Sequence, residues 1–319
     1  MSARTAAAMG DYAPRRANSK SLLMRMHKCR YIYLLMLPGL LYFVLFKYTP
    51  MWMLVIAFQR YSPFAGVMGS EWVGLANFRS LFQDAQFFRM LRNTLAINLL
   101  NLVFYFPLPI VLSLMLNEVK HERYKKSLQT VVYLPHFLSW VIVSSLTFFL
   151  LSVDVGLVNK LMRALGMKPY SFLSNPHIFW GILVGQTIWK ETGWSTISFL
   201  AAISGVDVEQ YEAATIDGAS RMQRILNITL PAIAPTILTM LILRLGNIAD
   251  VGFEQVLLMM NSMVNDVAEV FDTYSYRIGI QAGDASFGTT VSLFKGIVGL
   301  VFVYVSNKTV KKMGGDGIY

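Results

Sequence analysis

The chain has few charged residues, one cysteine and no motif of a known catalytic site. Charged residues make up 14% of its 319 residues, whereas hydrophobic residues make up 55%. A soluble domain carries about 25% charged and about 45–50% apolar residues. The shortage of charge therefore excludes a soluble enzyme, and the high hydrophobic content excludes a disordered protein. A mean hydropathy of +0.49 predicts a polytopic membrane protein instead.

Side chains that carry chemistry are equally scarce. Cys29 has no partner for an internal disulfide, and the histidines at 27, 121, 136 and 177 lack the spacing of metal ligands. Neither a Ser/His/Asp arrangement nor the phosphate loop G-x-x-x-x-G-K-[ST] occurs in the sequence. We therefore expect this chain to bind no cofactor, metal or nucleic acid and to hydrolyse no ATP by itself.

Six long apolar stretches predict six transmembrane helices. Crossing a hydrocarbon core about 30 Å thick takes roughly 20 helical residues. The stretches lie at about 31–58, 89–117, 128–152, 178–204, 229–260 and 286–307. The first is too long for a signal peptide, and we expect it to bend near Pro50. On the fourth, Gly181 and Gly185 form a G-x-x-x-G pattern that allows close approach of a neighbouring helix or reflects ordinary packing. The predicted fold class is an all-α integral membrane protein.

Basic residues are distributed unevenly between the segments that separate these spans. With the N-terminus in the cytoplasm, the cytoplasmic segments carry 16 Lys and Arg residues and the external segments carry 5. The side richer in Lys and Arg normally faces the cytoplasm. We therefore expect both termini in the cytoplasm, as tails at 1–30 and 308–319.

The cytoplasmic segment 205–228 has the pattern of two short helices joined by a glycine turn. Asp207 can cap the first helix, and Gly218 suits the left-handed conformation that ends a helix. Ser220 and Gln223 have the spacing of a capping box for the second helix, which runs into the fifth span.

The same segment carries the pattern E-A-A, three residues, G, nine residues, I-x-L-P. The fixed positions are Glu212, Ala213, Ala214, Gly218, Ile228, Leu230 and Pro231. This pattern resembles the signature of permease subunits of binding-protein-dependent ABC importers. Further runs, among them YLPHFLSW at 133–140 and GFEQ at 252–255, resemble the oligosaccharide branch of the maltose-importer-like superfamily. Within it, the chain most resembles permeases of alginate-oligosaccharide importers, and the resemblance covers residues 31–300.

The resemblance implies the type I ABC importer permease fold in the inner membrane of a bacterial cell. It also implies a second homologous permease, two ATPase subunits that bind ATP and Mg²⁺, and an extracytoplasmic solute-binding protein. In the family, the helix that carries E-A-A docks in a cleft of the ATPase and transmits its closure. Carried over, ATPase coupling would fall to Glu212, Ala213, Ala214, Asp217 and Gly218, with Glu212 bonding to the cleft and Gly218 setting the turn.

Three cations lie inside the predicted spans, where a charge costs roughly 2.5–3.5 kcal/mol and commonly marks a functional site. At about 1.5 Å per helical residue, Lys190, Arg244 and Lys295 all lie near the middle of the membrane. Only Glu191 accompanies them at that depth, because Asp250 lies toward the outer mouth. The excess of positive charge predicts a path for an anionic solute.

The resemblance sharpens this expectation, because lysines at positions 190 and 295 are usual in this branch and a cation at position 244 is not. That departure favours an acidic saccharide, such as a uronate oligomer of the alginate type, over a neutral one. Trp189 and Phe253 are candidates for stacking on sugar rings, although tryptophans at span ends are commonly interfacial anchors.

Three alternatives remain open at this point. Lys190 can pair with Glu191 or with an acid of the partner chain, and Lys295 can belong to a buried structural ion pair. The solute can be a neutral oligosaccharide. The chain can also be a stand-alone secondary carrier, although this would leave the E-A-A segment without a purpose and would call for helices broken near the midplane in both halves.

Overall fold

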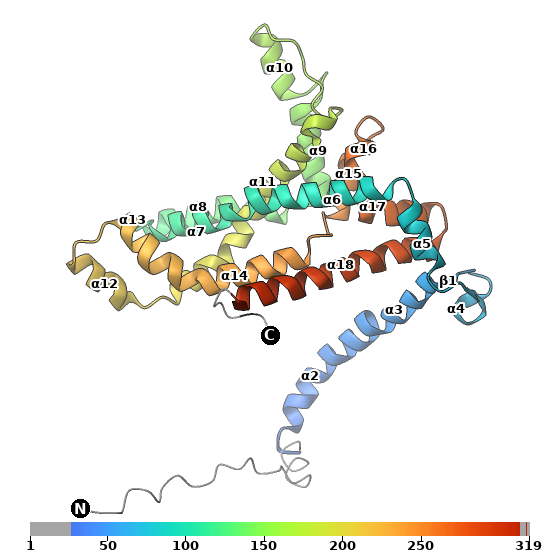
Figure 1. The fold of residues 1–319 in the computed structure, drawn as a ribbon. Helices are drawn as coiled ribbons and strands as arrows, with labels where there is room; N and C mark the ends of the chain where they lie inside the picture. Colours follow the sequence, from blue (N-terminus) through green and yellow to red (C-terminus); the bar gives the residue numbers. More distant parts are fainter. Residues whose placement is uncertain (1–26, 313–316, 318–319) are drawn as a thin grey trace, which may run out of the picture. The chain divides into compact units, whose positions relative to one another are not determined.

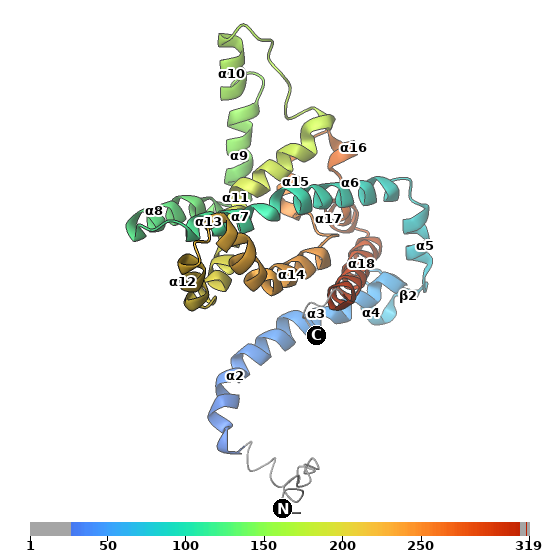
Figure 2. The same ribbon diagram turned by 60° about the vertical axis from the view of Figure 1, so that its left-hand side comes forward.

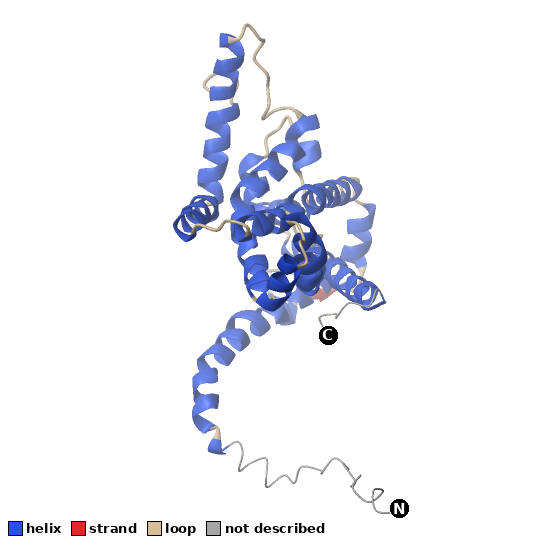
Figure 3. Cartoon of the chain, turned by 90° about the vertical axis from the view of Figure 1, so that its left-hand side faces the viewer, coloured by secondary structure: helices blue, strands red, loops and turns tan. Residues whose placement is uncertain are grey.

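The computed structural model describes residues 27–312 and 317, so the predicted tails at 1–30 and 308–319 lie largely outside the described residues. The chain divides into two compact units, residues 1–54 and 55–319. Helices dominate both (Figure 3), and within the described residues the strands are limited to one two-stranded ladder. The all-α class is therefore confirmed.

The described part of the first unit is a single apolar helix that changes type along its length. It comprises α2 (Arg30–Phe43), the π-helical η1 (Val44–Tyr48) and α3 (Thr49–Met51), and it continues into the second unit as the 3₁₀-helical η2 (Trp52–Phe58). Pro50 explains the change, because a proline offers no N–H and its ring clashes with the carbonyl four residues earlier. The same π-turn precedes Pro107 and Pro231.

The second unit contains the remaining elements (Figure 1). It opens with β1 (Gln59–Arg60), α4 (Gly66–Gly69), β2 (Glu71–Trp72) and α5 (Ala76–Gln83). Its long helical stretches are α6 (Phe87–Leu100), η3 (Asn101–Tyr105) and α7 (Pro107–Asn117); α8 (Glu122–Tyr133), η4 (Leu134–Phe137) and α9 (Trp140–Leu151); α11 (Pro176–Ser204); α13 (Arg221–Arg224), η5 (Ile225–Thr229) and α14 (Leu230–Gly246); and α18 (Ala285–Lys312). Between them lie α10 (Leu157–Ala164), α12 (Val208–Ile216), α15 (Phe253–Met259), α16 (Asn265–Ala268), α17 (Phe271–Tyr276) and η6 (Arg277–Gln281).

Several of these stretches are long and apolar enough to cross a membrane. Four qualify outright: Arg30–Phe58, Phe87–Asn117, Arg221–Gly246 and Ala285–Lys312. The bent pair Glu122–Phe137 and Trp140–Leu151 is a fifth candidate. Helix α11 is continuous over 29 residues but more polar than these four, since Gln186, Lys190 and Glu191 interrupt its apolar sequence. A multi-pass membrane protein is thus supported, while the number of six spans stays a prediction.

Two of the predicted spans are interrupted. In the stretch 128–152, the chain bends by 98° between η4 and α9. Pro135 lies in η4, and the next helix, α9, begins after its N-cap residue Ser139. The stretch 229–260 stops at the end of α14 and resumes only at α15. The break at 247–252 includes Gly252 at φ +92°, a conformation that favours glycine.

Glycines mark the closest helix contacts of the second unit. Helices α14 and α18 run side by side (Figures 1 and 2), and a Cβ added to Gly299 would lie 2.7 Å from the carbonyl oxygen of Gly246. On α11, a Cβ added to Gly193 would lie 2.1 Å from the carbonyl oxygen of Val132. The sequence pointed instead to Gly181 and Gly185, but a Cβ at either meets no described atom within 4 Å.

Candidate functional site

Segment 205–228 folds as the predicted pair of helices joined by a glycine turn (Figure 1). The side chain of Asp207 caps α12 by accepting a hydrogen bond from the backbone of the first turn, at 3.0 Å. Gly218 follows the helix at φ +78°, and Ser220 and Gln223 form the predicted capping box at the start of α13. The local structure is therefore confirmed, whereas a role in ATPase coupling stays a prediction.

The residues predicted for coupling are accessible. Glu212, Ala213, Asp217 and Gly218 are exposed, and Ala214 is half-buried. Apolar side chains accompany them on the same segment, because Val208, Ile216 and Met222 are also largely exposed. This surface thus offers both an acidic and an apolar contact to a partner.

Two hydrogen bonds tie α12 to the helix that follows it. The hydroxyl of Tyr211 lies 2.9 Å from Oγ1 of Thr229, at the entrance to the fifth span. Nη1 of Arg224 donates to Oγ1 of Thr215 at 2.7 Å. These bonds connect α12 to α13 and η5, which lead into α14.

Lys190, the first of the three predicted cations, is buried and paired. Its Nζ donates to the carbonyl oxygen of His136 at 2.7 Å and lies 3.1 Å from Oε1 of Glu191. The other carboxylate oxygen of Glu191 lies 2.7 Å from Nδ1 of His136, whose ring stacks on Trp194 at 4.4 Å. Lys190 is thus engaged in fixing the bend between η4 and α9 against α11.

Lys295, the second cation, is held by two carboxylates. Its Nζ pairs closely with Oδ1 of Asp272 and lies 3.4 Å from Oδ2 of Asp250. Sequence reasoning placed Asp272 in an external loop and missed this contact, because α17 lies against α18 only in the folded chain. Two of the three predicted cations therefore have carboxylate partners within this chain.

Arg244, the third cation, is half-buried and has a different environment. Its guanidinium carbon lies 5.6 Å from the ring centroid of Tyr105, and the Tyr105 hydroxyl lies 2.6 Å from Oγ of Ser195. Asp250 is close enough for an electrostatic interaction but not for an ion pair. Within the described part of the chain, no carboxylate oxygen lies within 4.0 Å of Arg244.

A cavity of about 510 Å³ lies between α14 and α18, and of the three predicted cations it has Lys295 in its lining. Its polar lining consists of Asn247, Asp250 and Lys295, and its glycines include Gly246 and Gly299. An exposed polar cluster on the face of a membrane helix is tolerated where protein or water covers it rather than lipid. This face is therefore the best candidate for part of a solute path.

The two predicted aromatic residues have different surroundings. Trp189 is 49% exposed and lines a mainly apolar cavity of about 420 Å³ with residues of α7 and α8. Phe253 packs on Tyr276 with ring centroids 5.1 Å apart. The structure therefore does not bring Trp189 to the cations near Asp250.

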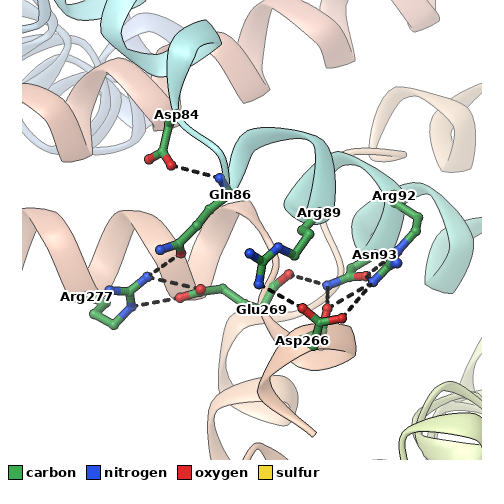
Figure 4. A network of polar contacts seen from close by, with 8 residues as sticks. All are labelled: Asp84, Gln86, Arg89, Arg92, Asn93, Asp266, Glu269 and Arg277. Carbon is green, nitrogen blue, oxygen red and sulfur yellow. Dashed lines mark hydrogen bonds and ion pairs between the residues drawn. The ribbon is translucent and has the colours of Figure 1, made fainter.

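A second polar network, which sequence reasoning missed, joins the start of α6 to the segment between α16 and η6 (Figure 4). Nη1 of Arg89 lies 2.8 Å from Oδ1 of Asp266, and Arg277 binds both carboxylate oxygens of Glu269 at 2.8 and 3.0 Å. The fully buried Asn93 donates to the carbonyl oxygens of residues 266 and 269 at 3.0 and 2.9 Å. The contacts of Arg89 and Asn93 connect elements more than 170 residues apart in the chain.

The charges of this network are internally matched. The hydrogen bonds that Arg277 donates to the Glu269 carboxylate raise the pKa of Arg277, so its guanidinium stays charged. Burial and the neighbouring Asp84, which accepts its hydrogen bond, raise the pKa of Tyr274 well above its usual range. A cavity of about 230 Å³ lies within the network, lined by both basic and acidic side chains. Because the charges balance, the network fits a structural clasp better than an anion site.

Comparison with known proteins identifies the family. The family described as "Binding-protein-dependent transport system inner membrane component" matches residues 109–310. The polygalacturonan/rhamnogalacturonan transport system permease protein YteP of Bacillus subtilis (strain 168) is 50% identical over 300 residues, which are 94% of either chain. The arabinooligosaccharides transport system permease protein AraP of the same organism is 28% identical over 288 residues, which are 89% of this chain and 90% of that protein.

A solved structure is similar over nearly the whole fold. A chain in the crystal structure of a bacterial alginate ABC transporter, in complex with an alginate pentasaccharide-bound periplasmic protein, superposes with a TM-score of 0.84 and 39% identity. The match covers 93% of this chain and 99% of that one. The present chain therefore belongs to the binding-protein-dependent transport system inner membrane components, and it is an ABC permease of the sugar and oligosaccharide type rather than an enzyme.

Proposed function

We propose that this chain and a second permease together form the path of an ATP-driven importer for an acidic oligosaccharide, delivered by an extracytoplasmic solute-binding protein. The observation that carries the proposal is Arg244, a half-buried cation without a carboxylate partner in the described chain. A uronate carboxylate would supply that partner by a charge-assisted hydrogen bond. Relatives named for polygalacturonan and alginate support an acidic solute, since both are polymers of uronic acids.

In this proposal, α12 is the contact with the ATPase. Two ATPase subunits would bind ATP and Mg²⁺, and one would receive the exposed surface around Glu212, Ala213, Ala214, Asp217 and Gly218. Closure of the ATPase pair would displace α12, and the hydrogen bonds from Tyr211 and Arg224 would carry this displacement to α14. Rigid-body movement of packed elements is a common way of opening and closing a path.

The proposed topology has six spans with both termini in the cytoplasm of a bacterial cell, the fourth span being α11. Its charges do not oppose insertion, because Lys190 and Glu191 satisfy each other within the chain. The excess of basic residues in the segments assigned to the cytoplasm supports the orientation.

A neutral oligosaccharide is the second candidate. Two observations favour it: Lys190 and Lys295 are neutralised by carboxylates, and one relative is named for arabinooligosaccharides, which are uncharged. If the role of Arg244 were limited to its contact with Tyr105, the path would have little net charge to select an acid.

Purification of the tagged chain from its native membrane in mild detergent tests the proposed assembly. We expect mass spectrometry to identify a second six-span permease in the same amount as this chain and ATPase subunits with a phosphate loop in twice that amount, together with a solute-binding protein. Addition of oligogalacturonate should then stimulate ATP hydrolysis by the purified complex. Recovery of the chain alone, with uptake into liposomes that needs no ATP, would contradict the proposal.

A further inference from the structure

Lys295 is held by two carboxylates that differ in their freedom to move. The Asp272 side chain is 19% exposed and lies on the helix α17, whereas the Asp250 side chain is 52% exposed. Lys295 itself is 22% exposed. Only Asp250 therefore faces enough open space to leave the ammonium group without disrupting packed structure.

The position of Asp250 in the chain supports the same distinction. It lies in the break between α14 and α15, where its Oδ1 accepts a hydrogen bond from the backbone N–H of Gly252 at 3.1 Å. Gly252 adopts φ +92°, so this short segment is a turn and not a helix. Turn segments absorb changes in backbone angle more readily than helices do.

Asp250 is also the carboxylate that interacts with both Lys295 and Arg244. It lies 3.4 Å from Lys295 and within electrostatic range of Arg244. With Asp272 included, the four groups sum to zero charge. A uronate carboxylate that entered this cluster would leave it with a net negative charge unless Asp250 moved away.

We propose that Asp250 is an internal counter-anion of the solute path, which a carboxylate of the acidic saccharide displaces from Lys295 and from the vicinity of Arg244. This inference rests on the proposed function. The cavity of about 510 Å³ between α14 and α18 includes Asp250 and Lys295 in its lining, so a sugar there reaches both. Asp250 therefore sets specificity: its negative charge competes with the solute, keeps the empty path neutral and raises the concentration of acid needed for transport.

The test is uptake kinetics in cells that carry the complete transport system with Asp250→Asn. The probes are oligogalacturonate and the same oligomer with its carboxyl groups reduced to alcohols. Removing the competing charge should lower KM for oligogalacturonate by roughly threefold, the scale of a half-exposed ion pair, and should leave the reduced oligomer unaffected. An unchanged or higher KM for oligogalacturonate would overturn the proposal.

Glu254→Gln is the matched control, because it removes one negative charge from the same segment at a side chain that is exposed and has no ion pair among the described residues. An equal effect of both variants would show a general electrostatic field and overturn the specific role of Asp250. Asp250→Ser serves as a second variant. If neither Asp250 variant reached the membrane, Asp250 would be a structural partner of Lys295, and the proposal would be wrong.

The wild-type measurement separates this proposal from the proposed function. Wild-type uptake of the reduced oligomer at the same rate as oligogalacturonate would contradict an acidic substrate. A wild-type preference for oligogalacturonate together with an unchanged KM in Asp250→Asn would contradict the role of Asp250 alone.

Discussion

The carboxylate of Glu191 joins Lys190 and His136, with one oxygen 3.1 Å from Nζ of Lys190 and the other 2.7 Å from Nδ1 of His136. His136 belongs to η4, 55 residues before Glu191 in the chain. These two contacts therefore hold the sharp bend before α9 against the polar middle of α11. It also explains why Lys190, although central in the sequence argument, is not free to meet a solute.

Glu191→Gln should therefore destabilise the chain. A fully buried ion pair that loses one partner costs about 3–5 kcal/mol, and we expect on the order of 2 kcal/mol here because the Glu191 side chain is 24% exposed. The melting temperature of the purified permease complex should fall by several degrees. Glu254→Gln should leave it unchanged, and a stable Glu191→Gln complex would argue against a fastening role.

Glu212→Arg should uncouple transport from ATP hydrolysis while the chain still inserts and assembles with its partner permease. The substitution reverses the charge of an exposed side chain on α12 that makes no side-chain hydrogen bond to another described residue. Glu209→Arg, an equally exposed acid on the same helix, is the control and should retain coupling. Solute-stimulated ATP hydrolysis is the measurement, and full stimulation in Glu212→Arg would refute the assignment of α12.

Gly218→Ala tests the turn that follows α12. At φ +78° a side chain costs about 1–2 kcal/mol, although a Cβ there would meet no described atom within 4 Å. We expect faster hydrogen exchange of the α12 backbone amides and weaker stimulation of ATP hydrolysis. Gly205→Ala, at the other end of α12 and at φ −84°, should change neither.

Gly193→Ala tests the close contact between α11 and α8. The added Cβ would lie 2.1 Å from the carbonyl oxygen of Val132, which is backbone and has little room to shift. Forced overpacking costs about 1–3 kcal/mol or more, so the amount of folded chain in the membrane should fall. Gly185→Ala on the same helix should be tolerated. Similar yields of the two variants would contradict the packing of α11 against α8.

Features that depend on residues close together in the chain, such as helix bounds and caps, could be predicted from the sequence. Helix α11 begins two residues before the predicted span 178–204 and ends where predicted, and the caps at Asp207 and Ser220 form as expected. Ion pairs between distant elements could not be predicted, because nothing in the sequence of α17 indicates that Asp272 meets Lys295. Pro135 is a local sign of the break in the third predicted span. The stretch 128–152 nevertheless reads as one span, because it is apolar on both sides of the break.

The break in the fifth span has a subtler cause. The apolar run 229–260 reads as one helix, and the local signs that it stops are Gly246 with Asn247 at the end of α14 and Gly252 before α15. The polar residues that this break exposes are the ones on which the proposed solute path depends. The sequence indicates Arg244 as a candidate, but only the packing of η3 and α11 around it shows that no described carboxylate pairs with it.

Uptake by Arg244→Gln, compared with Arg244→Lys, tests the central claim most directly. The loss of one hydrogen bond to a charged group costs about 1.5–3 kcal/mol, so uptake of oligogalacturonate should fall roughly tenfold or more in Arg244→Gln. Arg244→Lys should retain part of the activity, and uptake of the carboxyl-reduced oligomer should change little in either variant. Equal losses for the acidic and the reduced oligomer in Arg244→Gln would contradict recognition of an acidic saccharide by this chain.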